Sequence, residues 1–189
     1  MPKSQVAEKI ILSGFCDCQN LQGLQKDFND TGAVMPQSKS DLYKQVVNEV
    51  RAVMDTERDK IANAANVSAV LWMRLPELNW AGFYFACETG LVVGPFQGKP
   101  ACTRIEIGKG VCGTSAADRE TLIVPNVHEF PGHIACDAAS NSEIVIPLIK
   151  DDRVVGVLDI DSPVLDRFDA EDQAGLELVA KAFLELTEL

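Results

Sequence analysis

The fold is decided by one run of residues: Trp80-Ala81-Gly82-Phe83-Tyr84-Phe85-Ala86-Cys87, then Glu88-Thr89-Gly90, then Leu91-Val92-Val93-Gly94-Pro95-Phe96. Aromatic and β-branched residues favour strands. A short turn containing glycine between two such runs is typical of a β-hairpin. The sequence therefore predicts two adjacent antiparallel strands here.

The two faces of the first strand differ because successive side chains point to opposite sides. One face is predicted to be core, and it carries Ala81, Phe83, Phe85 and a Cys87 that we expect to be inert. The other face carries Trp80, Gly82, Tyr84 and Ala86. Gly82 would leave a hollow where a ligand lies against the indole and the phenol, although an ordinary half-buried strand gives the same pattern.

Helical patterns lie on both sides of this hairpin in the chain. Apolar spacing predicts one helix from Ser40 or Asp41 to Met54, a second over 59–75 that ends before Pro76, and a last helix starting near Asp169. Further strands are expected over 103–107, 121–124, 143–149 and 154–161. Segregated helices and a mainly antiparallel sheet indicate an α+β domain, with helices on one face and ligand-binding loops on the other.

Length and charge limit the classes of function. The 189 residues suit one compact domain, residues 38–189, after an N-terminal extension, residues 1–37, whose role the sequence does not reveal. The net charge of −11 repels phosphate backbones, so nucleic acid is not an expected partner. No apolar run approaches the roughly 20 residues of a membrane span. We recognise no targeting segment and expect a cytoplasmic protein that does not contact membranes.

Two carboxylates end the last predicted strand. Asp159 and Asp161 share one face, and Ile160 between them points to the other. Glu143, which begins the preceding strand, joins them if an odd-numbered loop connects the strands, whereas an even-numbered loop turns it away. Clustered acids repel one another, which favours a ligand with an ammonium group or a metal. Acids that only solvate a strand end would show the same spacing.

The chain has six cysteines, expected to be thiols in a reducing compartment: Cys16, Cys18, Cys87, Cys102, Cys112 and Cys136. Cys102, Cys112 and Cys136 lie in small-residue segments that we expect to be mobile loops suited to redox chemistry. His133, three residues before Cys136, suits a base, a zinc ligand or a loop hydrogen bond. No Cys-x-x-Cys occurs, and Cys16-x-Cys18 has no partner pair for a metal. A zinc site built from Cys102, Cys112, His133 and Cys136 is therefore disfavoured for lack of close ligand pairs, and we expect no metal.

Five segments together closely resemble the free methionine-(R)-sulfoxide reductases, which are small enzymes built on a GAF domain. These segments are residues 80–84 (WAGFY), 94–102 (GPFQGKPAC), 110–114 (GVCGT), 130–145 (FPGHIACDAASNSEIV) and 156–162 (GVLDIDS). The resemblance begins near residue 40 and leaves residues 1–37 outside. It implies a single GAF domain that reduces the R epimer of free methionine sulfoxide with protein thiols and no bound cofactor.

The resemblance also implies a role for each loop cysteine. Cys136 would attack the sulfoxide sulfur, release methionine and become a sulfenic acid. Cys102 would condense with it to a disulfide, which thioredoxin or a similar dithiol protein reduces. Cys112 matches a third family cysteine, an alternative or accessory resolving thiol. A function in oxidative stress and a homodimer formed through helices are further implications.

The substrate pocket implied by the resemblance contains Glu143, Asp159 and Asp161, with Trp80 and Tyr84 beside the substrate. Buried carboxylates would hold the ammonium group that distinguishes a free amino acid from a peptide residue. The Trp80 indole would pack against the S-methyl group, and a protonated Glu143 would donate to the sulfoxide oxygen. The alternative is a non-catalytic GAF domain that senses a small molecule and carries redox-active cysteines.

Overall fold

The computed structural model describes residues 38–132 and 137–189. The predicted extension, with Cys16 and Cys18, lies outside the described residues, and so do His133 and Cys136. In chain order the elements are α2 (Lys39–Val53), α3 (Lys60–Arg74), β1 (Trp80–Cys87), β2 (Gly90–Gly98), β3 (Arg104–Ile105), α4 (Gly110–Asp118), β4 (Leu122–Val124), the 3-10 turn η2 (Val127–Glu129), β5 (Ser142–Lys150), β6 (Arg153–Ser162) and α5 (Ala170–Leu186).

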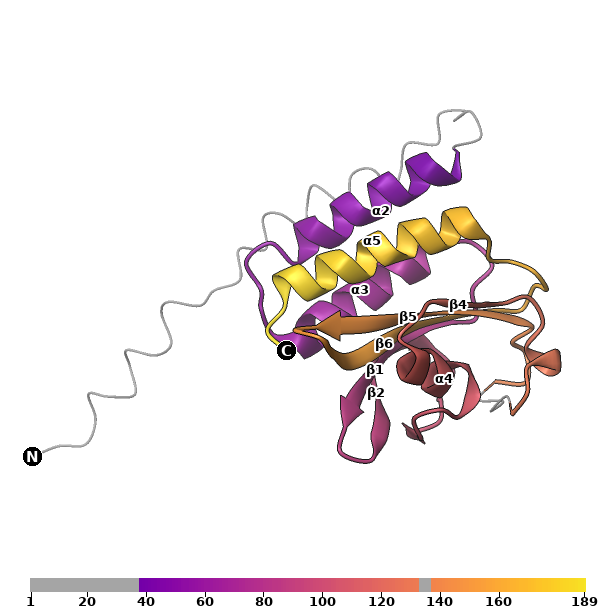
Figure 1. Ribbon diagram of the computed structural model, residues 1–189. Helices are drawn as coiled ribbons and strands as arrows, with labels where there is room; N and C mark the ends of the chain where they lie inside the picture. The colour runs from indigo at the N-terminus through magenta and orange to yellow at the C-terminus, as the bar shows by residue number, and fades with distance from the viewer. Residues whose placement is uncertain (1–37, 133–136) are drawn as a thin grey trace, which may run out of the picture. The chain divides into compact units, whose positions relative to one another are not determined.

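The described strands form one six-stranded sheet in the order β3-β2-β1-β6-β5-β4, and every neighbouring pair is antiparallel. Helices α2, α3 and α5 lie on one side of this sheet, while the short α4 lies on the other side with the loops (Figure 1). The predicted α+β class is confirmed. The candidate site lies on the side of the sheet that carries α4.

Alternation along β1 separates two apolar clusters, as the sequence predicts. Phe83 and Phe85 are buried with residues of the three covering helices, whereas Trp80 and Tyr84 belong to a second cluster on the α4 side. The prediction that Cys87 lies in the core is wrong, because its side chain is exposed. Helix α3 begins at Lys60, whose ammonium lies over the Phe85 ring, so the helical layer ends before Cys87.

Side-chain caps set the helix starts. Ser38, not Ser40 or Asp41, caps α2: it is extended, and its hydroxyl accepts from the Asp41 amide at 3.1 Å. Asp59 caps α3 and Asp169 caps α5, both where the sequence predicts a start. The predicted cap of α2 is therefore late by two or three residues, because Ser38 lies before the apolar pattern and its hydroxyl hydrogen-bonds both the amide and the carboxylate of Asp41.

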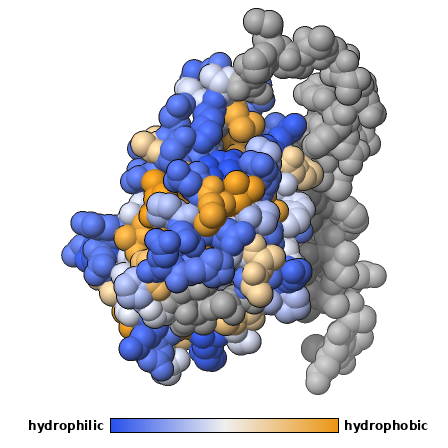
Figure 2. Space-filling view, turned by 90° about the vertical axis from the view of Figure 1, so that its right-hand side faces the viewer, coloured by the Kyte–Doolittle hydropathy of each residue, from blue (hydrophilic) through white to orange (hydrophobic). Residues whose placement is uncertain are grey.

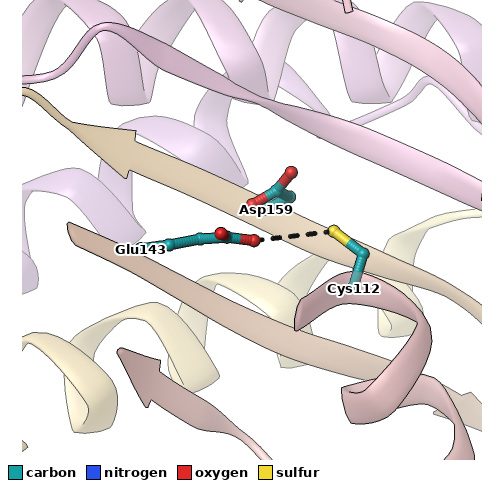
Figure 3. A group of neighbouring side chains, drawn as sticks. All are labelled: Cys112, Glu143 and Asp159. Carbon is teal, nitrogen blue, oxygen red and sulfur yellow. Dashed lines mark hydrogen bonds between the residues drawn. The ribbon is translucent and has the colours of Figure 1, made fainter. Parts of the chain in front are cut away.

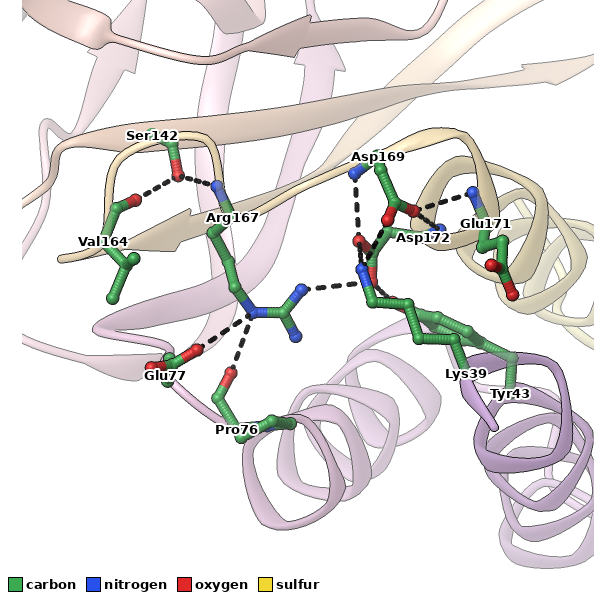
Figure 4. Close-up of polar contacts among 10 residues, drawn as sticks. All are labelled: Lys39, Tyr43, Pro76, Glu77, Ser142, Val164, Arg167, Asp169, Glu171 and Asp172. Carbon is green, nitrogen blue, oxygen red and sulfur yellow. Dashed lines mark hydrogen bonds and ion pairs between the residues drawn. The ribbon is translucent and has the colours of Figure 1, made fainter. Parts of the chain in front are cut away.

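A buried polar network joins the start of α2 to the start of α5 (Figure 4). The carboxylate of Asp172, which is 1% exposed, accepts from the Tyr43 hydroxyl at 2.9 Å, from Lys39 Nζ at 2.6 Å and from Arg167 Nη1 at 3.1 Å. The Arg167 backbone amide also donates to Ser142 Oγ at 3.4 Å, beside Glu143. This network fixes two helices and the loop before α5 to the start of β5.

The turn between β5 and β6 contains two residues. Asp151 and Asp152 have φ values of 49° and 59°, as a tight type I′ hairpin turn requires, and Lys150 pairs with Arg153. Without further irregularity, this even-numbered loop would place Glu143 opposite Ile160 rather than opposite an aspartate.

A β-bulge in β6 reverses that outcome. Leu148 pairs with Gly156, whereas Ile149 pairs with Val154, so Val155 is the extra residue. Past this point odd positions pair with odd positions, and Glu143 faces Asp161. The bulge in β6, rather than an odd-numbered loop, therefore brings Glu143 to the same face as the two aspartates.

Figure 2 shows one face on which hydrophilic residues predominate and apolar residues form a small patch. Within residues 38–132 and 137–189, no helix combines the length and the apolar character that crossing a bilayer requires.

Candidate functional site

Three acids lie in neighbouring positions on the α4 side of the sheet. Asp161 on β6 pairs with Trp80 of β1 on one side and with Glu143 of β5 on the other. Asp159, two residues earlier on β6, shares this face. Glu143 and Asp159 are each only 6% exposed, while Asp161 is partly exposed. We call Glu143, Asp159 and Asp161 the acid cluster; the structure assembles it as the sequence predicts for odd-to-odd pairing.

Cys112 lies over the acid cluster, on a helix rather than on a mobile loop. Residues 110–118 form α4, and Cys112 in its first turn is 4% exposed. The predicted loop is wrong because glycines here serve close packing: a Cβ on Gly113 would lie 2.2 Å from the Glu106 carbonyl oxygen. The residues that follow, Thr114-Ser115-Ala116-Ala117, were the part of the sequence that indicated a helix here.

The Cys112 thiol points at two of the acids (Figure 3). Its Sγ donates to Glu143 Oε1 at 3.9 Å, and single ligand atoms of Cys112, Glu143 and Asp159 all lie within 4.8 Å of one another. The three side chains come from α4, β5 and β6. A thiol and two carboxylates thus converge in a buried volume.

Burial dominates the ionisation of these groups. It raises the pKa of Asp159 to about 6, against the opposing effect of hydrogen bonds from Cys112, Glu143 and the Ile160 amide. Burial, and then the charges of Asp159 and Asp161, hold the pKa of Glu143 well above its ordinary value. The pKa values of Asp161 and Cys112 are also raised, again mainly by burial. At neutral pH the acid cluster therefore retains protons that exposed carboxylates would have lost.

An aromatic wall stands beside the acid cluster. The Trp80 ring stacks on Tyr84, with centroids 5.7 Å apart, and on Phe96, with centroids 5.1 Å apart. The hollow expected over Gly82 is not present: a Cβ there would lie 2.3 Å from the Phe96 Cβ, so the neighbouring strand fills the space. Gly82 permits the close approach of β2, and Phe96 is a wall residue that the sequence analysis missed.

The pocket opens between the acid cluster, Tyr84 of the aromatic wall and the N-terminus of α4. Its described lining is mixed polar and apolar, and comprises Tyr84, Ile105, Gly110, Val111, Cys112, Asp137, Ser140, Glu143, Asp159 and Asp161. Two buried polar atoms beside it, Trp80 Nε1 and Asp159 Oδ1, have no hydrogen-bond partner among the described residues. One is a donor and the other an acceptor, which is the pattern expected of a site built for a polar ligand.

Two loops that carry predicted thiols meet at the pocket. The Tyr84 hydroxyl donates to the Cys102 carbonyl at 3.1 Å, and Cys102 itself is partly exposed. In the same loop, Lys99 Nζ lies 3.2 Å from Asp137 Oδ1, and Asp137 directly follows Cys136 in the chain. Cys136 itself lies outside the described residues.

Asn79 and Asp137 are site residues that the sequence analysis did not single out. Asn79 Nδ2 donates to Asp137 Oδ2 at 3.3 Å and to Ser140 Oγ at 2.9 Å. The Ala139 amide and the Lys99 and Asn79 side chains lower the pKa of Asp137. Asn79 adjoins Trp80 and Asp137 adjoins Cys136, so their place beside two predicted site residues was the available signal.

Comparison with known proteins agrees with this geometry. The model of the GAF domain family matches residues 39–183. A free methionine-R-sulfoxide reductase of Escherichia coli is 51% identical over 145 residues, which cover 76% of this chain and 88% of that protein. The chain belongs to the GAF-domain family of free methionine-(R)-sulfoxide reductases. The resemblance of the sequence motifs to this family of oxidoreductases is thereby confirmed.

Solved structures of family members share the fold. The free methionine-R-sulfoxide reductase of Neisseria meningitidis, in complex with its substrate, is 42% identical and superposes with a TM-score of 0.77, covering 80% of this chain and 92% of that one. The reduced form of the Staphylococcus aureus enzyme is 48% identical, with a TM-score of 0.74, and covers 76% of this chain and 94% of that one.

Proposed function

We propose that this chain reduces free L-methionine (R)-sulfoxide to L-methionine with its own thiols. The observation that carries the proposal is the unpartnered Asp159 Oδ1 in a buried acid cluster, beside an aromatic wall. Such a pocket is suited to a small molecule that has both a cationic group and an apolar group. Free methionine sulfoxide has both, and two named relatives are reductases of this amino acid.

The acid cluster accounts for a preference for the free amino acid. Asp159 and Asp161 bind the substrate ammonium through charge-assisted hydrogen bonds, and the unpartnered Asp159 oxygen accepts one of them. A methionine sulfoxide within a peptide has an amide in place of the ammonium, which would leave the buried acids without a cation. The first turn of α4, with Gly110 and Val111 in the pocket lining, offers a positive helix end for the substrate carboxylate.

Glu143 and Trp80 act on the sulfoxide end of the substrate. The indole packs against the S-methyl group. Because its raised pKa keeps Glu143 protonated, the carboxyl group donates to the sulfoxide oxygen as the S–O bond breaks. This hydrogen bond is stronger in the transition state than in the ground state, and it therefore accelerates the reaction.

The thiols supply two electrons for each turnover. Cys136 attacks the sulfoxide sulfur, methionine leaves, and the oxygen remains on Cys136 as a sulfenic acid. The thiol of Cys102 then displaces that oxygen as water and forms a disulfide, which thioredoxin or a similar dithiol protein reduces. Cys102 is the better resolving thiol because it is partly exposed, whereas burial raises the pKa of Cys112 and disfavours its thiolate. Such a cycle belongs in a reducing compartment such as the cytoplasm.

Incubation of the full chain with racemic free methionine sulfoxide and a thioredoxin system tests the proposal. We expect the R epimer alone to disappear, with one methionine formed for each sulfoxide lost, and N-acetylmethionine sulfoxide to persist. If neither epimer is consumed while the amino acid still binds, the chain is a sensing GAF domain instead.

A further inference from the structure

Amino-acid binding leaves one feature of the pocket without a function. The Cys112 thiol is buried against two carboxylates, at 3.9 Å from Glu143 Oε1, although the proposed substrate presents no group that needs sulfur there. A thiol that is only 4% exposed is poorly accessible to a sulfenic acid or to a reductant. The convergence of this thiol with two carboxylates is instead suited to binding a cation.

The geometry matches a small metal site. The ligand atoms of Cys112, Glu143 and Asp159 lie within 4.8 Å of one another. Zinc bonds of about 2.3 Å to sulfur and about 2.0–2.2 Å to oxygen hold neighbouring ligand atoms roughly 3.5 Å apart. Ligand atoms up to 4.8 Å apart need to approach one another by up to about 1.3 Å to bind one ion. Their three parent elements, α4, β5 and β6, are already packed together (Figure 3).

The unpartnered oxygen supplies a second, independent observation. Asp159 is 6% exposed and its Oδ1 has no hydrogen-bond partner among the described residues, although Asp159 lines a pocket together with Asp161 and Tyr84. A divalent cation would satisfy this oxygen and relieve the repulsion among the buried acids at once. The pocket would leave a further coordination position open, as in zinc sites that are not fully enclosed by protein.

The donor set selects the metal. One thiolate and two carboxylates suit a borderline-soft ion such as Zn²⁺, and they suit Mg²⁺ or Ca²⁺ poorly, because those ions prefer oxygen alone. The spacing of the acids was compatible with a metal, but it did not place Cys112 beside them, because Cys112 lies far from Glu143 and Asp159 in the chain.

We propose that the reduced protein binds one Zn²⁺ ion at Cys112, Glu143 and Asp159, and that the bound ion excludes the amino acid from the pocket. Binding displaces the thiol proton of Cys112 and the carboxyl proton of Glu143, both of which pass to solvent, and forms one zinc–thiolate bond and bonds to the two carboxylates. No oxidation or reduction occurs. The exclusion of substrate rests on the proposed function, whereas metal binding itself does not.

Cobalt titration of the reduced full chain tests the metal site directly. Co²⁺ is a spectroscopic substitute for zinc, and a thiolate-to-cobalt charge-transfer band should grow to one equivalent and disappear when Zn²⁺ is added. Cys112→Ser should abolish the band, whereas Cys87→Ser, which alters an exposed thiol outside the pocket, should retain it. Asp159→Asn should weaken binding by at least about 10-fold, a loss seen even for groups that only orient a ligand.

A band that persists unchanged in Cys112→Ser would overturn the proposal, because the metal would then occupy other cysteines. Thermal unfolding without metal shows whether Cys112→Ser is folded; if it is not, an unchanged affinity in Asp159→Asn would overturn the proposal equally.

Inhibition separates this inference from the proposed function. If the chain is a reductase, Zn²⁺ should compete with methionine sulfoxide, and Mg²⁺ should not. A chain with the cobalt band but no reductase activity would contradict the proposed function and leave the metal site intact. A chain with reductase activity but no cobalt band would contradict the metal site and leave the proposed function intact.

Discussion

Glu143 of β5 lies directly opposite Asp161 of β6, and the single extra residue Val155 sets this pairing. A two-residue turn alone would have placed Ile160 opposite Glu143. Because side chains alternate between faces, one bulged residue decides whether the third acid reaches the pocket or the helical core. The acid cluster is thus a product of strand register as much as of residue type.

The pKa of Asp159 predicts how stability depends on pH. Folding raises this pKa from the ordinary 3.8 to about 6, so between these values the folded chain holds a proton that the unfolded chain has lost. The contribution of Asp159 to the free energy of unfolding is therefore greatest below about pH 4. It falls as the pH rises to 6, by roughly 3 kcal/mol at most. Asp159→Asn should remove this loss and stabilise the ligand-free protein at pH 7.

Denaturant unfolding between pH 4 and 7 measures the effect, with the exposed Asp41→Asn as a control. An equally steep loss of stability in Asp159→Asn would show that burial does not perturb this carboxyl group.

Glu143→Gln tests proton donation to the sulfoxide. The amide keeps the size of the side chain and can donate a hydrogen bond, but it cannot transfer a proton. We expect methionine formation in a single turnover to slow by about 100-fold or more, with a much smaller change in substrate affinity. In the unmodified chain the rate should fall as the pH rises through the elevated pKa of Glu143. A rate within a factor of two of the unmodified chain would exclude the acid role.

Lys99→Met tests whether the ion pair to Asp137 aligns the two thiol-bearing loops. Since exposed ion pairs contribute roughly 0.2–1 kcal/mol, the disulfide should form about 1.4- to 5-fold more slowly, while the first methionine forms at an unchanged rate. Quenched-flow mass spectrometry resolves the two steps. Lys181→Met is a matched control, because Lys181 is as exposed as Lys99, at 68%, and lies on α5. Equal effects of both substitutions would argue against alignment.

Asp172→Ala tests the buried network. Its loss leaves Arg167, which is 8% exposed, without its buried acceptor, and should cost about 3–5 kcal/mol of unfolding free energy. Tyr43→Phe removes one hydrogen bond from the same carboxylate and should cost about 1 kcal/mol. Glu185→Ala breaks an exposed ion pair between the same two helices and should cost less than about 1 kcal/mol. Chemical denaturation measures the loss of unfolding free energy in the three variants. Equal losses would contradict the claim that the buried network stabilises the fold more than an exposed ion pair does.

Local periodicity was enough to predict much of this fold. Alternation placed Phe83 and Trp80 on opposite faces of β1, and the two-residue spacing of Asp159 and Asp161 put both acids on one face. These outcomes depend only on the geometry of a single strand, which a sequence pattern expresses directly.

The parts that could not be predicted depend on contacts between elements. The bulge at Val155 has no sequence signature of its own, and α4 was hidden because Gly108, Gly110 and Gly113 resemble a loop. Position 113 needs glycine because a Cβ there would clash with the Glu106 carbonyl oxygen. Cys87 is exposed because α3 begins at Lys60 and does not cover it. Each is a matter of tertiary packing rather than of local preference.

The central claim is that Cys136 attacks the sulfoxide of an amino acid held by the acid cluster, and that Cys102 then resolves the product. Single-turnover methionine release from pre-reduced protein without added reductant tests it most directly. Cys102→Ser should release one equivalent of methionine and retain a sulfenic acid at Cys136, whereas Cys136→Ser should release none. Methionine release by Cys136→Ser, with none from Cys102→Ser, would contradict the account.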